Sequence, residues 1–271
     1  MAEVYEHHLS IKKNKLLPFK VGKGAKKNSG YSNWHDSPEI IFVREGEVSL
    51  RSGTVTVNLS KGDIAVINCG AVHCLFGNGE RDYRFLIIDE EFCLENGIDA
   101  SKFDFDLKIS DPRLFDLLES ISDKTDRPQS ERGELFNAIL RRDVLNVMIM
   151  ICSSHSKERA IDRQYDSVSE KYVKNTIAYI NENYRDEITL EELSDLCGIT
   201  KYHLAREFKR YTGQTVFTYV NLLRCKRADA AIREGKSIAD AAYECGFGSL
   251  AYFSRTYKRL MGVSPSTAKR G

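Results

Sequence analysis

The sequence lacks several features that would place it in a special class. Its 271 residues include only 5 Pro, 18 Gly and 1 Trp, a composition that excludes collagen-like and low-complexity chains. The N-terminus has no apolar core of the kind found in signal peptides. The longest apolar runs, such as Val147 to Cys152, are far shorter than the roughly 20 residues that span a bilayer. We therefore expect a soluble protein that is neither secreted nor membrane-spanning.

Paired cysteines and an excess of one charge are also missing. The 7 cysteines are an odd number without a CxxC pair, which predicts reduced thiols in the cytoplasm.

The 40 Lys and Arg nearly balance 39 Asp and Glu, whereas proteins that bind nucleic acid are usually visibly basic. The balance is uneven along the chain, however, with a net charge of −3 over residues 1–160 and +4 over 161–271. A nucleic-acid partner therefore stays open for the C-terminal half.

The N-terminal half has the pattern of antiparallel β structure. Short β-branched and aromatic runs are separated by turn residues such as Glu45-Gly46 and Lys61-Gly62-Asp63. Regular short strands of this kind favour a small barrel or sandwich over residues 1–110. The predicted strands lie at 40–43, 48–50, 55–57, 64–67 and 85–88.

Residues 111–152 change to helical periodicity. One apolar stripe runs from Leu114 to Ile121, and a broader one runs from Leu135 to Ile151. Because the second helix is apolar on more than one face, we expect it either to pack on the barrel or to form the interface of a homodimer. The polar stretch 153–168 has no apolar period and is predicted to be a linker.

An internal repeat organises the C-terminal residues 169–271. The segment TLEELSDLCGITKYHLAREFKRYTG matches SIADAAYECGFGSLAYFSRTYKRLMG, which carries one additional residue, Gly248. Each copy has a capped helix, a stop glycine and a second capped helix, as at Thr189, Gly198 and Thr200. Two helices joined by so short a turn form a helix-turn-helix unit, whose second helix can lie in the major groove of DNA.

The predicted units span 189–211 and 237–261. A helix over 215–233 connects them and would hold the two second helices at a fixed separation. To read successive major grooves on one face of a duplex, that separation must be about 34 Å.

Both second helices expose basic side chains when their apolar residues face inward. Arg206 and Arg255 take the same place in the two copies, and Arg can bond guanine O6 and N7 in a bidentate manner. One turn further on, four cations are placed to meet phosphates: Lys209, Arg210, Lys258 and Arg259. The other residues predicted to face outward are Lys201, Tyr202, Ala205, Leu250, Ala251 and Tyr252.

These residues resemble the DNA-binding domain of the AraC/XylS family of bacterial transcription regulators. The resemblance covers about 100 residues, and its most specific part is GFGSLAYFSRTYKRLMGVSP. The chain departs from the family at Ala268-Lys269, where a Tyr-Arg pair is common, and at Ala231, where bulkier residues are common. The resemblance implies base-reading positions at Tyr202, Ala205 and Arg206, and at Leu250, Ala251, Tyr252 and Arg255. Leu250 and Ala251 offer only apolar contacts, so the second helix is expected to read thymine methyl groups or DNA shape.

The N-terminal half resembles the cupin-type sensor domain that many members of this family carry. His35, Glu39 and Gly46 are similar to the first cupin motif, and Gly62, Gly70 and His73 to the second. The resemblance implies a barrel that binds a small-molecule effector. Its expected lining is Tyr31, Trp34, His35, Glu39 and His73.

Three of these residues leave two interpretations open. In metal-binding cupins the first motif supplies two histidines separated by one residue, whereas the partner of His35 is Ser37. His35, Glu39 and His73 could still hold a transition metal with open positions, or they could be satisfied polar side chains of a barrel mouth. Sensor barrels of this family usually lack metal, so we expect no metal and no cofactor.

The sequence thus predicts an α+β chain of several domains. They are a cupin-like antiparallel barrel (1–110), a helical dimerisation segment (111–152), a linker (153–168) and an all-α tandem helix-turn-helix domain (169–271). The expected function is a cytoplasmic, non-enzymatic transcription regulator controlled by an effector. Its expected partners are double-stranded promoter DNA, a second copy of the chain and RNA polymerase. The alternative, a cupin-type metal-dependent enzyme or metal sensor that uses His35, Glu39 and His73, leaves the helical repeat unexplained.

Overall fold

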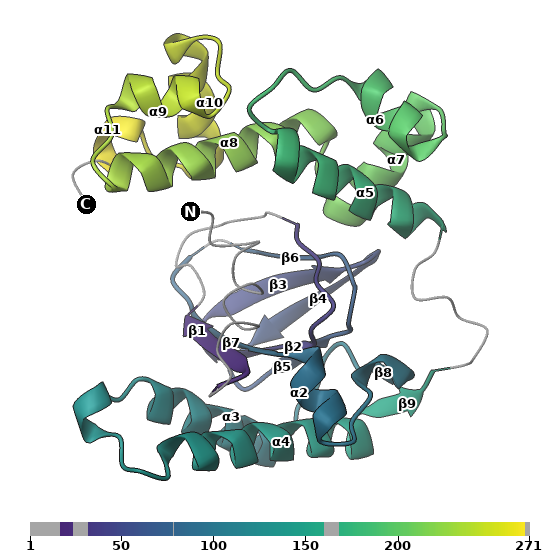
Figure 1. Ribbon diagram of the computed structural model, residues 1–271, viewed down its shortest axis with the longest axis vertical. Coiled ribbons are helices and arrows are strands. Elements are labelled where there is room, and N and C mark those ends of the chain that lie inside the picture. The colour runs from purple at the N-terminus through teal and green to yellow at the C-terminus, as the bar shows by residue number, and fades with distance from the viewer. Residues whose placement is uncertain (1–16, 24–31, 78, 160–167, 269–271) are drawn as a thin grey trace. The chain divides into compact units, whose positions relative to one another are not determined.

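The structure is a computed structural model that describes residues 17–23, 32–77, 79–159 and 168–268 (Figure 1). The contacts between these residues divide the described part of the chain into two units. One, the barrel unit, contains residues 17–23 and 34–159. The other, the helical unit, contains residues 168–268 together with Ser32 and Asn33. Among the described residues, no helix is both long enough and apolar enough to cross a membrane.

Two antiparallel sheets form the centre of the barrel unit, as predicted for an antiparallel β domain (Figure 1). The four-stranded sheet has the order β1-β7-β2-β5, and the three-stranded sheet has the order β4-β3-β6. The strands β1 and β6 were not predicted, because FKVGK contains a glycine and two lysines, which are uncommon in strands, and HCLF is only four residues long. The strand bounds are β1 Phe19–Lys23, β2 Glu39–Glu45, β3 Glu47–Ser52, β4 Val55–Ser60, β5 Ile64–Ile67, β6 His73–Phe76 and β7 Asp82–Ile88.

Strand β2 is buried on both faces, which explains its continuous apolar run. Side chains alternate across a strand, so Ile41 and Val43 share one core with Leu50 of the three-stranded sheet. Ile40 and Phe42 face the other way and share a second core with helices α3 (Pro112–Thr125) and α4 (Phe136–Ser154). The four-stranded sheet therefore lies between the other sheet and the two helices.

Helix α3 begins where the sequence provides a cap and a proline. The Asp111 carboxylate accepts hydrogen bonds from two backbone amides of the first turn, and Pro112 occupies a position where no amide is needed. The remaining short elements of this unit are α2 Glu90–Glu95, η1 Ala100–Lys102, β8 Phe103–Phe105, η2 Gln129–Glu131 and β9 Ser156–Glu158.

The predicted linker over 153–168 is wrong in its first part. Ser153 and Ser154 complete α4, and Ser156–Glu158 form β9, which pairs in an antiparallel manner with β8. The ion pair between Arg159 and Asp104, at 2.8 Å, holds this end of the ribbon. A polar strand such as β9 has no apolar period, so a pairing between segments about 50 residues apart leaves no signal in the local sequence.

The helical unit consists of two helix pairs on either side of a long helix, α8 (Val216–Arg233). The first pair is α6 (Leu190–Cys197) and α7 (Lys201–Thr212), and the second is α9 (Ile238–Glu244) and α10 (Leu250–Met261). Helix α7 extends one residue beyond the predicted end of its unit at 211, and α10 ends at the predicted residue 261. The unit is completed by α5 Val168–Asn183 and α11 Pro265–Ala268.

One short segment that lies between β1 and β2 in the sequence packs with the helical unit. Ser32 is fully buried, and its carbonyl accepts a hydrogen bond of 2.8 Å from the hydroxyl of Tyr219 on α8. Its own hydroxyl donates to the carbonyl of Thr212, the last residue of α7, at 3.3 Å. Ser32 thus belongs to the core beneath the end of α7.

Candidate DNA-binding helices and sensor site

The second helix of the first pair, α7, presents a polar face because its apolar residues are used for packing. The Thr200 hydroxyl caps its start, and Gly213 ends it in the left-handed region at φ 74°. Leu204 and Phe208 are fully buried, whereas Tyr202 is 79% exposed. The other predicted DNA-facing residues of this helix are exposed or half-buried: Lys201, Ala205, Arg206, Lys209 and Arg210.

Acidic side chains neutralise much of the charge on α7. Glu207 is almost fully buried and lies 3.2 Å from Nε of Arg206, and it also pairs with Arg210. Burial disfavours the charged form of Glu207, but hydrogen bonds and the neighbouring guanidinium groups outweigh it and lower the pKa of this carboxyl. Glu191 of α6 pairs with Lys201 in the same way. Binding of phosphate or bases by these cations must compete with the protein's own carboxylates.

The corresponding helix of the second pair, α10, is built alike. The Ser249 hydroxyl caps its start, and Gly262 ends it at φ 76°. Phe253 and Tyr257 are fully buried and hold the helix against α8 and α9. All six predicted DNA-facing residues are exposed: Leu250, Ala251, Tyr252, Arg255, Lys258 and Arg259.

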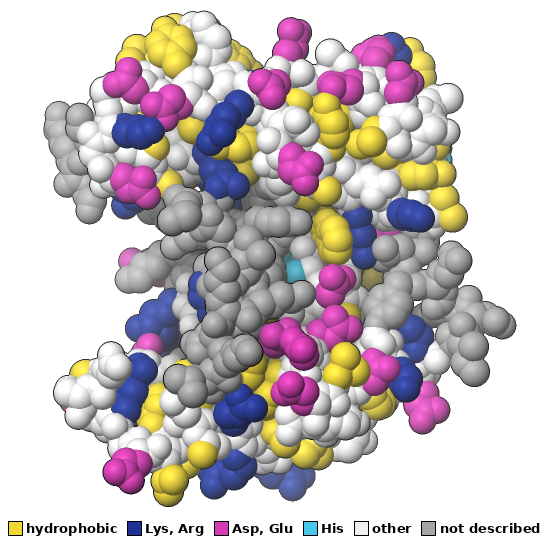
Figure 2. Space-filling view, viewed as in Figure 1, with side chains coloured by type: hydrophobic (Ala, Val, Ile, Leu, Met, Phe, Trp, Pro, Cys, Tyr) yellow, Lys and Arg dark blue, Asp and Glu magenta, His cyan; other side chains and the backbone are white. Residues whose placement is uncertain are grey.

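The two helices differ in how their cations are partnered. Within the described part of the chain, Arg255, Lys258 and Arg259 form no ion pair, and neither does Lys209 of α7. Figure 2 shows acidic and basic side chains mixed over the visible face of the helical unit, without one broad basic patch. Any attraction for phosphate therefore depends on local placement, and most of the described cations without a carboxylate partner on the two helices lie on α10, with Lys209 on α7.

Asn221 was missed by the sequence reasoning. It lies on α8 and donates a hydrogen bond of 3.1 Å to the hydroxyl of Tyr252 on α10. Because Asn221 lies within the helix predicted over 215–233, nothing in the sequence indicated its hydrogen bond with Tyr252. Asn221 holds one of the expected base-reading side chains in a fixed direction.

In the barrel unit, two histidines and a glutamate join the two sheets. Glu39 begins β2 of the four-stranded sheet, His73 begins β6 of the three-stranded sheet, and His35 lies in the segment before β2. Oε2 of Glu39 lies 3.0 Å from Nε2 of His35 and 3.1 Å from Nε2 of His73. Each of the three residues is at most 6% exposed. The structure therefore brings together three of the side chains that the sequence motifs singled out.

The hydrogen bonds of the two Nδ1 atoms determine which contacts with Glu39 are favourable. Nδ1 of His35 lies 2.7 Å from the carbonyl oxygen of Ser37, and Nδ1 of His73 lies 2.9 Å from that of Ala71. A carbonyl only accepts, so each Nδ1 must carry a proton. In a neutral ring, Nε2 would then present a lone pair to the oxygen of Glu39. The contacts at Glu39 are favourable only when each Nε2 carries a proton or faces a cation.

The charges of the cluster follow the same logic. Burial disfavours a charged Glu39, but hydrogen bonds from His35 and His73 outweigh it and hold the pKa of this carboxyl well below its usual range. Burial also disfavours a charged His73, but its hydrogen bond to Glu39 outweighs this and raises the pKa of the imidazole. Glu39 thus acts as the buried counter-charge of His73.

The same three residues fit a metal ion by their chemistry. One donor atom from each lies within 4.8 Å of the others, and backbone carbonyls orient both imidazoles as they do for many metal-bound histidines. Ser37 does not contribute a side-chain ligand; its carbonyl orients His35 instead. Of the other predicted lining residues, Trp34 is half-buried beside His35 in sequence, and Tyr31 lies outside the described residues.

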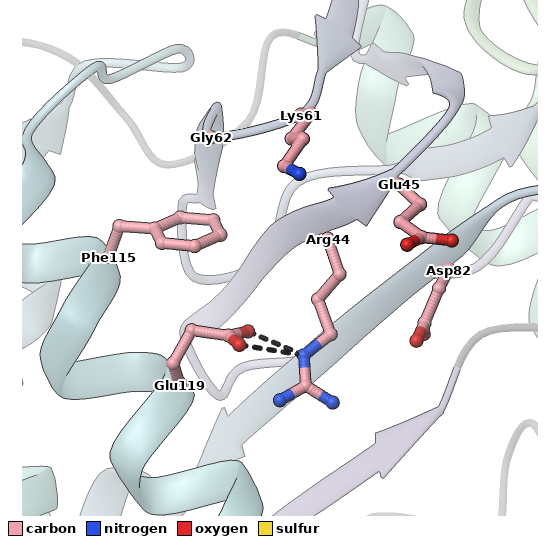
Figure 3. A pocket seen from close by; sticks show the side chains of 7 residues that line it. All are labelled: Arg44, Glu45, Lys61, Gly62, Asp82, Phe115 and Glu119. Atoms are coloured by element: carbon pink, nitrogen blue, oxygen red, sulfur yellow. Dashed lines mark hydrogen bonds and ion pairs between the residues drawn. The ribbon is translucent and has the colours of Figure 1, made fainter.

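A pocket of about 380 Å³ lies elsewhere in the barrel unit (Figure 3). Among the described residues its lining is Arg44, Glu45, Lys61, Gly62, Asp82, Phe115 and Glu119, a set that does not include Trp34, His35, Glu39 or His73. Nε of Arg44, on β2, lies 2.6 and 2.9 Å from the two carboxylate oxygens of Glu119 on α3. No pattern in the sequence indicated this pocket, because it forms where a strand end meets a helix about 75 residues later.

Comparisons with known proteins agree with both units. A helix-turn-helix domain model matches residues 193–271, and a cupin domain model matches residues 20–89. The transcriptional activator RhaS of Citrobacter koseri is 26% identical over 157 residues, which are 57% of this chain and 51% of that protein. The bifunctional transcriptional activator/DNA repair enzyme AdaA of Bacillus subtilis is 34% identical over 89 residues, 32% of this chain and 42% of that protein. The chain thus spans about half the length of these curated relatives.

A solved structure extends the likeness over both units. Apo ToxT from Vibrio cholerae matches 93% of this chain and 97% of its own, with a TM-score of 0.52 and 15% identity, which shows a shared fold. The matches to a helix-turn-helix domain and to a cupin domain agree with the resemblance to the AraC family that the sequence motifs indicate. The helices α7 and α10 are the second helices of the two helix-turn-helix units, and we refer to them below as the reading helices.

Proposed function

We propose that this chain is an AraC-family, sequence-specific transcription regulator that binds promoter DNA through α7 and α10. The observation that carries the proposal is the repeated, capped helix-turn-helix unit, which exposes a polar face with Arg206 in one copy and Arg255 in the other. The proposal places the protein in the cytoplasm, with RNA polymerase as a further partner at the promoter and no enzymatic activity of its own.

The test uses the full chain and a random duplex library. Repeated selection should yield a shared sequence motif, and the affinity for it should fall steeply with salt, because each phosphate contact adds about 0.9 to the slope of log K against log salt. Lys258→Gln should lower that slope, whereas the matched control Lys157→Gln, on β9 of the barrel unit, should leave it unchanged. Selection that recovers no motif, with folded protein, would refute the proposal.

Control by a small-molecule effector in the barrel unit is the second part of the proposal. Two sites support it: the buried cluster around His73, and the pocket beside Glu119 (Figure 3). A thermal-shift screen of small metabolites on the full chain should identify molecules that stabilise it. Loss of the shift in His73→Gln but not in Glu119→Gln assigns the effector to the cluster, and the reverse result assigns it to the pocket. If no metabolite shifts the melting temperature, the effector proposal fails.

Dimerisation through residues 111–152 is a third part, supported by apolar side chains left exposed on and beside α4. Ile149 is 50% exposed and Leu135 is 69% exposed. Apolar side chains of this size at the surface are typical of interfaces when they lie together. Ile149→Asp should convert a dimer to a monomer in light scattering, and Thr54→Asp, in the turn between β3 and β4, is the charge-matched control. A wild-type chain that is monomeric at every concentration contradicts this part.

A metal sensor is a second candidate function, favoured by the His35, Glu39 and His73 cluster alone. A transition metal held there would replace the protons between the ring nitrogens and Glu39, and would offer open positions to a ligand. Elemental analysis of the untagged full chain decides, since stoichiometric metal supports this candidate and its absence removes it.

A further inference from the structure

The two reading helices belong to one chain, so their relative orientation decides which DNA fits both. Helix α8 contacts each helix-turn-helix unit separately. Near its start the ring of Tyr219 packs on Phe208 of α7, with ring centres 5.4 Å apart. Near its end Asp229 accepts a hydrogen bond from the hydroxyl of Tyr257 on α10. These contacts hold each unit to α8, but they do not link one unit to the other.

A direct link exists at the middle of α8. Nε of Arg224 donates to the carbonyl of Tyr184 at 2.6 Å, and a terminal nitrogen donates to the carbonyl of Asp186 at 2.7 Å. Both carbonyls belong to the loop between α5 and α6, which leads directly into the first helix-turn-helix unit. The same guanidinium lies 6.0 Å from the ring centre of Phe247, which is buried in the second unit. Arg224 therefore contacts both the loop that leads into the first unit and a buried ring of the second unit.

The loop also touches the second unit through its backbone. Gly246 ends α9 at φ 85°, and a Cβ placed on it would lie 2.5 Å from the carbonyl oxygen of Arg185. That contact is too short for any residue with a side chain. Gly198 takes the corresponding place in the first unit at φ 65°, but a Cβ there would meet nothing within 4 Å. In the first copy, Gly198 is therefore required only for its positive φ. In the second copy, Gly246 is required both for its positive φ and for the close approach of the Arg185 carbonyl.

We propose that Arg224 and Gly246 are positioning residues that clamp the loop Tyr184–Asp186 between the two helix-turn-helix units and thereby set the half-site spacing that the protein accepts. The inference rests on the proposed DNA-binding function. A planar guanidinium is suited to this role, because its donors point in fixed directions and two carbonyls can be held together. Neither residue is among those expected to contact DNA, so both act through the orientation of α7 and α10.

Half-site spacing is the property that the clamp should control. One additional base pair rotates the second half-site by about 34° and advances it by about 3.4 Å, which a rigid pair of reading helices does not follow. When two linked modules cannot engage together, the gain from linkage, often about 100-fold or more, is lost. A rigid protein should therefore show one sharp optimum of spacing, and a loosened one should show a broad optimum.

The experiment measures affinity of the full chain for its selected duplex, for the same duplex with one base pair added or removed between the half-sites, and for the first half-site alone. In the wild type we expect a penalty of about 10-fold or more for either change of spacing. Arg224→Met and Gly246→Ala should reduce that penalty to less than about 3-fold and weaken the full site by about 10-fold, with little change at the half-site. Arg224→Lys keeps the charge without the bidentate geometry and should show a smaller change in the same direction.

Two controls separate positioning from general damage. Lys171→Met removes one positive charge from the exposed surface of α5, and Gly198→Ala introduces the same strain at positive φ without the clash. Both should keep the wild-type penalty. If Arg224→Lys and Gly246→Ala keep it as well, the clamp is refuted even though the protein binds DNA. If the wild type selects no two-part site, it is the proposed function that fails.

Discussion

Replacing Glu39 by glutamine tests the charge arrangement of the buried cluster. Glutamine has nearly the same shape, but it is neutral, and its amide can donate as well as accept. When the imidazoles are neutral, their Nε2 lone pairs can accept hydrogen bonds from the new amide. When His73 is protonated, the glutamine provides no counter-charge, and the imidazolium is buried beside a neutral group. The variant should therefore be tolerated at high pH and unstable at low pH.

The size of the effect follows from burial and distance. Glu39 is 6% exposed and meets two imidazole nitrogens at 3.0 and 3.1 Å. Removing one partner of a buried ion pair typically costs about 3–5 kcal/mol, because the other charge is left without compensation. We expect Glu39→Gln to lower the free energy of unfolding by about 3 kcal/mol or more at pH 5.5. At pH 9, where hydrogen bonds can be remade, the loss should be below about 1 kcal/mol.

The pH window follows from the directions of the two pKa shifts. Because the pKa of His73 is raised above 6.5, its contribution to wild-type stability is complete below pH 6.5 and is lost as the pH rises through the folded-state value. Because the pKa of Glu39 is lowered from 4.5, its contribution is complete above pH 4.5 and is lost only in acid. At pH 5.5 both contributions act, and at pH 9 that of His73 is weakened.

Urea unfolding of the full chain, followed by fluorescence, provides the measurement. Trp34 is the single tryptophan of the sequence and is the direct neighbour of His35, so its emission reports on the barrel unit. EDTA in the buffer excludes a metal contribution. Glu45→Gln, at the exposed end of the same strand, is the control and should change stability by less than about 0.5 kcal/mol. Equal losses for Glu39→Gln at pH 5.5 and pH 9 would show that the carboxylate does not balance a protonated His73.

Three further predictions concern the helical unit and the thiols. Glu207→Gln should tighten DNA binding roughly 2- to 5-fold by releasing its half-exposed arginine partners, as measured by fluorescence anisotropy; unchanged or weaker binding contradicts the competition inferred for α7. Arg206→Ala should cost about 1–3 kcal/mol at the selected site and relax base preference there, whereas Lys258→Ala should weaken all duplexes alike and reduce the salt slope by about one. Burial raises the pKa of the Cys69 and Cys225 thiols to about 12. Neither thiol should therefore be alkylated by iodoacetamide at pH 8 until the chain is unfolded. Rapid labelling of the native protein, detected by mass spectrometry, would contradict this prediction.

The features that the sequence predicted best are those that depend on local chemistry. Threonine and serine caps, stop glycines and a 3.6-residue apolar period determined α7 and α10 almost to the residue, because each is specified within one or two turns. Thr189 and Glu192 have the spacing of a capping box, in which the two residues cap each other, but only one of its two hydrogen bonds is present among the described contacts. The Thr189 hydroxyl accepts from the Glu192 amide, but the Glu192 carboxylate is taken by the hydroxyl of Tyr179 on α5.

Features that depend on distant partners were not predictable in the same way. The β8–β9 ribbon joins polar segments about 50 residues apart, and nothing in SKE indicates a strand. The helical spacing predicted that Arg206 faces outward, but it gave no indication that the neighbouring Glu207 pairs with it. The cluster at Glu39 was assembled correctly from motif spacing, but the carbonyls that fix both imidazoles become visible only with the backbone in place.

The position of Ser32 has a practical consequence for isolating the DNA-binding part. A fragment that begins at residue 165 or 169, as the sequence alone suggests, would omit the residue that accepts the hydrogen bond of Tyr219 and donates to the carbonyl of Thr212. Each group left buried without a partner costs about 1–3 kcal/mol, a large share of the stability of a domain of about 100 residues. Such a fragment should melt at a lower temperature than the same unit in the whole chain. If such a fragment bound DNA weakly, the cause would be the missing packing of Ser32. The measurement would then say little about the affinity of the intact regulator for DNA.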